Sequence, residues 1–121
     1  MIRKHDQMRR EHFECLKEGD GCVDMINILE PEELYGLGRF FGVTLIPPGA
    51  SNGLHTHKGD FETYYILRGT AEVNDNGTLH VLGPGDMVQC RSGQSHAIRN
   101  VGPDMLEYIA VILYDRPDSF V

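Results

Sequence analysis

Hydrophobic and polar residues alternate in short runs along most of this chain, and glycine or proline interrupts the runs. From residue 21 onward the pattern predicts strands separated by turns about every eight to twelve residues. The predicted strands cover residues 22–29, 39–46, 54–57, 61–67, 70–74, 78–82, 87–90, 95–100 and 106–114. Asp75-Asn76-Gly77 predicts a tight hairpin turn, because Asn and Gly tolerate a positive φ. Many short strands joined in this way indicate an all-β sandwich or barrel.

The N-terminal residues carry a different pattern. Residues 7–18 predict a short helix, capped by Asp6 and stopped by Gly19. An irregular segment or an edge strand fits the same residues, so residues 1–20 are described here as an N-terminal arm. Residues 30–33, which read Glu-Pro-Glu-Glu, predict a turn or a single helical turn.

Length and charge limit the classes of function. A chain of 121 residues is sized for one domain, residues 1–121, that buries a core without disulfide or metal staples. The net charge of −7 argues against nucleic acid or an anionic membrane surface as the main partner. No apolar run approaches the roughly 18 residues of a membrane span. Three cysteines without a CxxC spacing predict reduced thiols in a cytoplasmic protein.

Two histidines and a glutamate gather around one turn. His55 and His57 project to the same side of a strand, because side chains alternate between faces. The turn at residues 58–60 folds the chain back and places Glu62 beside them. Two imidazoles and a carboxylate are three ligands of a divalent transition-metal site. His96 is the best candidate for the fourth ligand, since it starts another strand after a glycine turn.

These residues also carry a family resemblance. Residues 49–69 resemble the first motif of the cupin superfamily at every fixed position, which are Gly49, His55, His57, Glu62 and Gly69. Residues 85–100 resemble its second motif, with Gly85, Gly93, His96 and Asn100 in place. Arg91 departs from the pattern, because the family usually has proline there. That proline shapes a turn and binds no metal, so the metal site stays credible. The two motifs together are specific.

The resemblance implies a double-stranded β-helix, a jelly-roll barrel of six strands, over most of the chain. It also implies one divalent transition metal per chain (Mn, Fe, Ni, Co, Cu or Zn, with Mn or Fe favoured). His55, His57, Glu62 and His96 would be the ligands, and the remaining positions would be open to water, oxygen or substrate. Mixed nitrogen and oxygen donors do not by themselves select one metal.

Other side chains are candidates for contact with a ligand. Tyr64 shares the predicted inward face of Glu62, where it could hydrogen-bond a ligand or pack in the core. Arg91 places a donor-rich side chain near the predicted barrel mouth. Arg39, Arg91 and Arg99 could pair with an anionic substrate or lie on the solvated surface.

The resulting functional hypothesis is a metal-dependent enzyme acting on a small polar or anionic organic molecule, such as a carboxylate or sugar derivative. Lewis-acid or oxygen-activating chemistry would make it a dioxygenase-like oxidoreductase, a lyase or an isomerase. Tyr64 or an arginine such as Arg91 would orient the substrate. A non-catalytic binding or sensor protein using the same cavity is the alternative. We also expect a homodimer in which residues 1–30 contribute to the interface.

Overall fold

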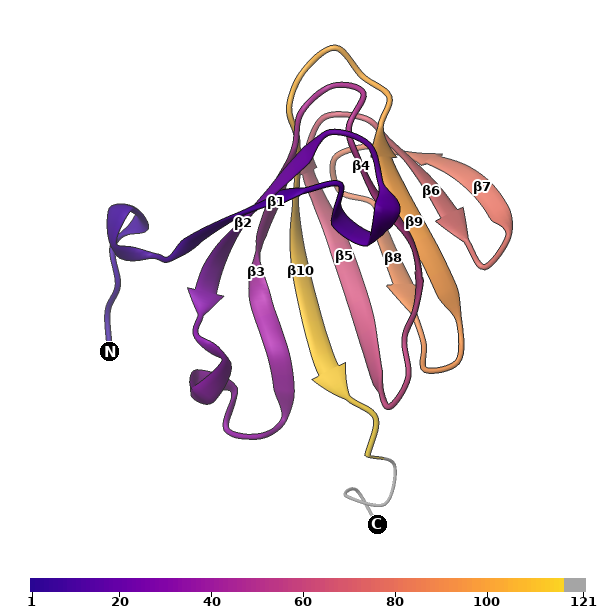
Figure 1. The fold of residues 1–121 in the computed structure, drawn as a ribbon. Helices are drawn as coiled ribbons and strands as arrows, with labels where there is room; N and C mark the ends of the chain where they lie inside the picture. Colours follow the sequence, from indigo (N-terminus) through magenta and orange to yellow (C-terminus); the bar gives the residue numbers. More distant parts are fainter. Residues whose placement is uncertain (117–121) are drawn as a thin grey trace.

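Two antiparallel β-sheets make up the molecule (Figure 1). The computed structural model describes residues 1–116. The larger sheet has the strand order β1-β2-β3-β10-β5-β8, and the smaller has the order β4-β9-β6-β7. The strands are β1 (Arg10–Glu14), β2 (Cys22–Leu29), β3 (Gly38–Ile46), β4 (Ser51–Thr56), β5 (Asp60–Arg68), β6 (Ala71–Asp75), β7 (Thr78–Leu82), β8 (Met87–Cys90), β9 (Ser95–Asn100) and β10 (Leu106–Tyr114). Short 3₁₀ turns are η1 (His5–Gln7), η2 (Leu16–Glu18) and η3 (Pro31–Leu34).

The predicted all-β jelly-roll architecture is confirmed. From residue 21 onward every predicted strand is present, and most begin and end within one residue of the prediction. The main difference is β4, which begins at Ser51 rather than at residue 54. The hairpin turn between β6 and β7 has positive φ at Asn76 (50°) and Gly77 (101°), as its sequence predicts. The helical turn predicted at residues 30–33 is present as η3.

Of the alternatives for residues 7–18, the edge strand is confirmed and the helix is wrong. The structure has an edge strand there, β1, which lies between the turns η1 and η2. In β1, Glu11 and Phe13 are half-buried while their neighbours are exposed, which is the period-2 pattern of a strand. Phe13 pairs with Val23 of β2. Pairing with β2 therefore overrides the weak local preference for a helix.

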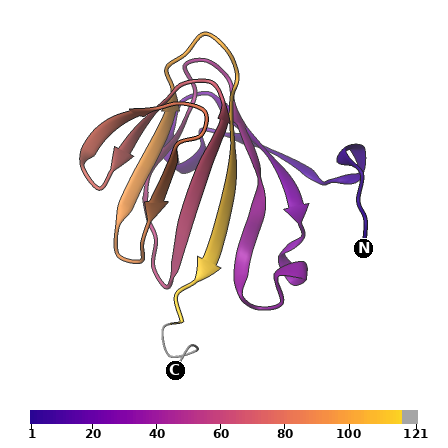
Figure 2. The same cartoon turned by 180° about the vertical axis from the view of Figure 1, so that it is seen from behind.

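The core lies between the two sheets and extends up to the candidate ligands. β10 lies between β3 and β5 in the larger sheet (Figure 2). Its alternate residues Leu106, Tyr108 and Ala110 are at most 1% exposed. On β5 the same alternation buries Glu62, Tyr64 and Ile66 on one face, as the sequence predicts. Fully buried residues such as these fix the strand register, because a slip of one residue would turn every side chain over.

The N-terminal arm returns to the barrel and packs against β4. A Cβ atom built on Gly19 would lie 2.3 Å from the Ser51 carbonyl oxygen, and one built on Gly53 would lie 2.0 Å from that of Lys17. Only glycine permits so close an approach of two backbones. Asp20 closes the contact, because its backbone N–H donates to Ser51 Oγ and its carbonyl accepts from the Ser51 N–H, both at 2.9 Å. Among residues 1–116 no helix has the length and apolar character to cross a membrane.

Candidate metal centre

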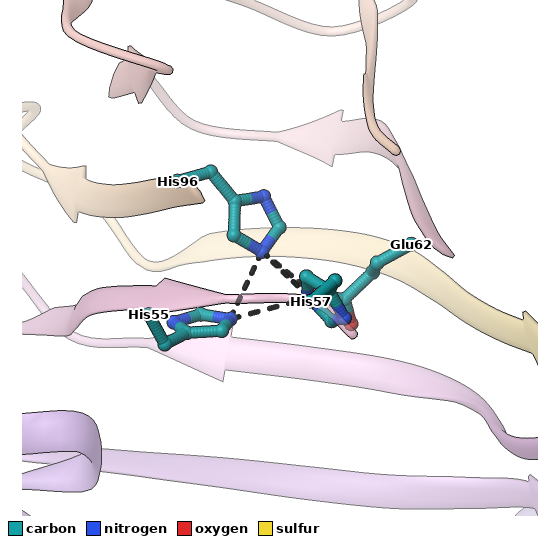
Figure 3. Close-up of side chains that lie close together, drawn as sticks. All are labelled: His55, His57, Glu62 and His96. Atoms are coloured by element: carbon teal, nitrogen blue, oxygen red, sulfur yellow. Dashed lines mark hydrogen bonds and ion pairs between the residues drawn. The ribbon is translucent and has the colours of Figure 1, made fainter. Parts of the chain in front are cut away.

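The four predicted ligands come together between the two sheets (Figure 3). His55 lies on β4, and His57 follows that strand directly. Glu62 lies on β5, and His96 on β9 pairs directly with His55 across the smaller sheet. One donor atom from each side chain lies within 4.8 Å of the others. Three of the four residues are buried, and His55 is half-buried. The sequence prediction of this cluster is therefore confirmed as a spatial arrangement.

The spacing of the donor atoms matches the spacing of ligands around one metal ion. The Nε2 atom of His96 lies 3.0 Å from that of His57 and 2.9 Å from that of His55. Glu62 Oε1 lies 3.1 Å from His96 Nε2 and 3.2 Å from His57 Nε2. With metal–ligand bonds of about 2.1 Å, ligands at right angles lie about 3.0 Å apart and tetrahedral ligands about 3.4 Å apart. On average these four distances are closer to the right-angle spacing than to the tetrahedral one, whereas His55 Nε2 and Glu62 Oε1 lie farther apart, at 3.9 Å.

Hydrogen bonds behind two of the imidazoles direct their lone pairs inward. His57 Nδ1 lies 2.7 Å from Asp60 Oδ1, and His55 Nδ1 lies 2.7 Å from the Gly53 carbonyl oxygen. Both partners accept hydrogen bonds, so each Nδ1 carries the proton and each Nε2 presents a lone pair. Glu62 adds a carboxylate oxygen at the same point. Converging lone pairs repel one another unless a cation or a proton lies between them, so this donor set fits a metal ion.

The ionisation of the ligands also suits a cation. Burial alone would raise the pKa of Glu62, but contacts with three imidazoles outweigh burial and hold that pKa well below its usual range. Burial lowers the pKa of His96, which favours its neutral form. The pKa of His57 is raised, first by its contact with Glu62 and then by Asp60, against the effect of burial. A proton on His57 Nε2 is therefore the competitor of the metal for that lone pair.

Comparison with known families agrees with this geometry. A family profile described as "Cupin domain" matches residues 42–112. The chain is a cupin. The match begins in β3 and ends in β10, so it contains all four candidate ligands and most of the jelly roll.

The cupin has a relative that matches nearly its whole length. It is 38% identical over 113 residues to a protein of Thermotoga maritima named "Oxalate-binding protein", and the match covers 93% of each chain. A crystal structure of a predicted oxalate decarboxylase from the same organism superimposes with a TM-score of 0.91 at 37% identity, covering 95% of this chain and 100% of that one. The structure of the polyketide cyclase RemF of Streptomyces resistomycificus superimposes with a TM-score of 0.76 at 15% identity, covering 97% of this chain and 82% of that one. At so low an identity the likeness shows the fold alone.

A more distant relative is a germin-like protein of Arabidopsis thaliana, subfamily T member 3. The two are 33% identical over 98 residues, which is 77% of this chain and 43% of the relative. The cupin thus spans less than half of that protein, and the likeness concerns the shared cupin region.

A cavity of about 260 Å³ adjoins the metal centre of the cupin. His55, His57 and Glu62 form one side of it, and Phe40 and Ile112 contribute apolar surface from the larger sheet. The rest of the wall consists of Glu11, Phe13, Leu16, Lys17, Met25, Arg39, Asn52 and Thr56. Four of these wall residues come from the N-terminal arm, so the arm covers the approach to the metal centre.

The predicted contact residues lie at different distances from this cavity. Tyr64 is 2% exposed; its hydroxyl donates to Glu62 Oε1 at 2.9 Å, and it is not among the residues that line the cavity. Arg91 is exposed in the turn after β8 and contacts Gln89, beside a different cavity. Arg99 binds the Gly49 carbonyl and Asp20. The roles predicted for Tyr64 and Arg91 stay predictions.

Arg39 is the predicted arginine that the structure brings to the cavity. Its Nε–H donates to Asp60 Oδ2 at 2.7 Å, and Asp60 in turn holds His57. Burial opposes ionisation of Asp60, but Arg39 and His57 together lower its pKa. Sequence reasoning missed Asp60, although it precedes Glu62 by two residues and so shares its face of the strand.

Asn52 is a second residue that sequence reasoning missed. β4 has a register shift between Asn52 and His55, where two residues oppose one on β9. The bulge turns Asn52 to the same face as His55, into the wall of the cavity. Asn52 is 6% exposed, and its Oδ1 finds no hydrogen-bond partner within residues 1–116. A buried amide oxygen of this kind is costly unless a ligand or water meets it. The Gly53 within the bulge was the available signal.

Proposed function

We propose that this cupin binds one divalent transition metal through His55, His57, Glu62 and His96, and that the metal binds a small carboxylate such as oxalate. The observation that carries the proposal is the convergence of four donor atoms within 4.8 Å of one another, beside a cavity that three of the four residues line. The relative named oxalate-binding protein, at 38% identity over nearly the whole chain, supports the choice of ligand.

Manganese or iron is the metal we propose. Both take six ligands from mixed nitrogen and oxygen donors. The Nε2 atom of His96 lies 3.0 Å from that of His57 and 2.9 Å from that of His55, which suits neighbouring ligands of such an ion. Four protein ligands around a six-coordinate ion leave two positions open. When bound, the metal supplies a Lewis acid that attracts and polarises a carboxylate oxygen.

The protein's own residues prepare this site in three ways. Asp60 and the Gly53 carbonyl hold the two imidazoles of β4 in the tautomer that binds a metal. The pKa of Tyr64 is raised well above its usual value, first by burial and then by the charge of Glu62. Tyr64 therefore stays protonated, and its hydroxyl donates a hydrogen bond to Glu62. The N-terminal arm limits the access of water to the cavity.

Metal content tests the first half of the proposal. Protein purified without chelators should hold about one metal ion per chain by element analysis, and a His57→Ala, His96→Ala double variant should lose it. A His5→Ala, His80→Ala double variant is the matched control, because both residues are exposed and lie outside the cluster. Equal metal content in the two double variants would refute the assignment.

Calorimetry tests the second half. Oxalate, malonate, pyruvate, acetate and a neutral sugar should be titrated into metal-loaded and metal-free protein. We expect carboxylates to bind only the loaded form, at micromolar to millimolar strength typical of small substrates. The −7 net charge opposes anions at long range, but salt screens it beyond about 8 Å. Binding that is the same without metal would contradict the proposal.

Turnover separates the enzyme hypothesis from the binding-protein hypothesis. An oxalate decarboxylase would convert oxalate and one proton into formate and carbon dioxide, so both products should be measured after incubation with metal-loaded protein. Formate released in proportion to carbon dioxide would identify an enzyme. Stable oxalate with measurable affinity would identify a binding or sensor protein.

We also propose that the chain forms a homodimer to which residues 1–30 contribute. β1 is an edge strand of the larger sheet, which leaves backbone groups available for a second chain. At the other end of the same sheet, Met87 of the edge strand β8 (57%) and Tyr65 (47%) and Leu67 (40%) of the adjacent β5 remain exposed. Sedimentation at micromolar concentration should give the mass of two chains, and a monomer would contradict this proposal.

A further inference from the structure

The guanidinium of Arg39 is only partly used by its neighbours. Its Nε–H donates to Asp60, whereas no residue within 1–116 accepts a hydrogen bond from its two terminal nitrogens. The side chain is 51% exposed and lines the cavity beside the metal centre. A guanidinium presents its donors as a rigid fork that matches a carboxylate. Arg39 therefore has donors available for an anion in the cavity.

Lys17 adds a second positive residue to the same wall. It belongs to η2 of the N-terminal arm and has no ion-pair partner within residues 1–116. Its backbone is left-handed (φ 53°), as are those of Cys15 (φ 49°) and Glu18 (φ 62°). Non-glycine residues in this conformation cost free energy and persist only where the surroundings hold them. The close contact of the arm with Gly53 supplies that restraint.

Glu11, the acidic residue of the arm that lines this cavity, does not neutralise the charges of Arg39 and Lys17. Glu11 lines the cavity, but its Oε1 forms an ion pair with Arg9 at 2.9 Å and accepts a hydrogen bond from Asn27 Nδ2 at 3.0 Å. Asp60 is likewise paired with Arg39 and His57. Lys17 therefore has no acidic partner within residues 1–116, and Arg39 contacts Asp60 through Nε while its terminal nitrogens contact no acid there.

We propose that Arg39 and Lys17 bind the distal carboxylate of a dicarboxylate whose first carboxylate occupies the metal centre. The site then selects diacids over monoacids, because only a diacid engages both the metal and the cationic wall. This inference rests on the proposed carboxylate binding and specifies its substrate class. It assigns selectivity to residues outside the metal ligands, one of them on the N-terminal arm.

An Arg39→Gln variant isolates the proposed contact. The side-chain nitrogen of glutamine stands where arginine has Nε, so the hydrogen bond to Asp60 can form while the terminal nitrogens and the charge are removed. A Lys17→Met variant removes the second cation. Lys4→Met is the control, since it makes the same change of net charge on an exposed residue outside the cavity wall.

Calorimetry with oxalate, malonate and acetate on the metal-loaded proteins tests the inference, and element analysis checks that each variant holds the same metal. We expect Arg39→Gln to lower the affinity for oxalate and malonate about tenfold, and Lys17→Met to lower it about threefold. The affinity for acetate should change less than about twofold in both variants. Lys4→Met should match the wild type. Diacid and acetate affinities that fall equally in Arg39→Gln, or do not fall, would overturn the inference. If no carboxylate binds the wild type, the proposed function itself fails.

Discussion

Replacing Gly53 with alanine should loosen the N-terminal arm from β4. A Cβ atom at this position would lie 2.0 Å from the Lys17 carbonyl oxygen, 2.9 Å from its carbonyl carbon and 2.8 Å from the Gly19 nitrogen. All three are backbone atoms, so no side-chain rotation relieves the clash. The backbone of Gly53 is outside the left-handed region, and the effect of alanine is therefore steric.

The size of the effect follows from these distances. Non-bonded heavy atoms attract at about 3.5 Å, so the Lys17 carbonyl must retreat by roughly 1.5 Å. Overpacking of this kind costs about 1–3 kcal/mol, and alanine recovers about 0.4–1 kcal/mol by restricting the unfolded chain. The free energy of unfolding should therefore fall by about 1–2 kcal/mol. With an unfolding entropy of about 2.1 cal/mol/K per residue, this chain should melt about 4–8 °C lower.

Gly83→Ala is the matched control for this experiment. No atom lies within 4 Å of a Cβ built on Gly83, and its φ is also outside the left-handed region. Thermal unfolding gives the stability, and hydrogen exchange at the Ser51 amide, which donates to the Asp20 carbonyl, reports detachment of the arm. Melting within about 1 °C of the control, with unchanged exchange at Ser51, would refute the idea that this contact holds the arm.

Two further predictions concern charged hydrogen bonds. Asp60→Asn should weaken metal binding about tenfold to a hundredfold, because the neutral amide holds the His57 tautomer less strongly; equal affinity by competition with a fluorescent chelator would contradict this. The pKa of His12 is raised, first by Glu14 and then by Asp24, so its stabilising charge is present below about pH 6.5 and lost as the pH rises through the folded-state pKa. In chelator, His12→Gln should therefore cost more stability near pH 5.5 than near pH 8.5 by urea unfolding, and a cost independent of pH would contradict the assignment.

The period-2 pattern was enough to predict that three of the four candidate ligands lie together, because their positions depend on strand geometry. His55 and His57 follow one strand, and Glu62 begins the face that continues through Tyr64. His96 needed more, since it is distant in sequence and meets His55 only through strand pairing across the smaller sheet. Its place at the start of a strand after a glycine turn made it the best candidate for the fourth ligand, and the family resemblance implied the same residue.

The cavity wall was less predictable for physical reasons. Asn52 faces inward only because β4 has a bulge, and a bulge shifts the alternation that sequence reasoning relies on. The sequence left the arm open between a helix, an irregular segment and an edge strand, because its fold depends on pairing with β2 and on backbone contact at Gly19 and Gly53. A local pattern contains none of these contacts. Arg39 was one of three candidate arginines, and the sequence favoured Arg91 instead, because Arg91 departs from the family pattern near the predicted barrel mouth.

The candidate metal ligands and the N-terminal arm should respond differently to substitution. The candidate metal ligands lie on, or directly after, strands whose register is fixed by a buried core, so we expect that altering one of them removes metal without moving its neighbours. The arm lies at a sheet edge, carries left-handed residues and depends on a few contacts with β4. Substitutions in the arm can therefore alter which anion enters the cavity while the metal centre stays intact. If Lys17→Met changed metal content as strongly as His96→Ala, this separation between metal binding and ligand choice would be wrong.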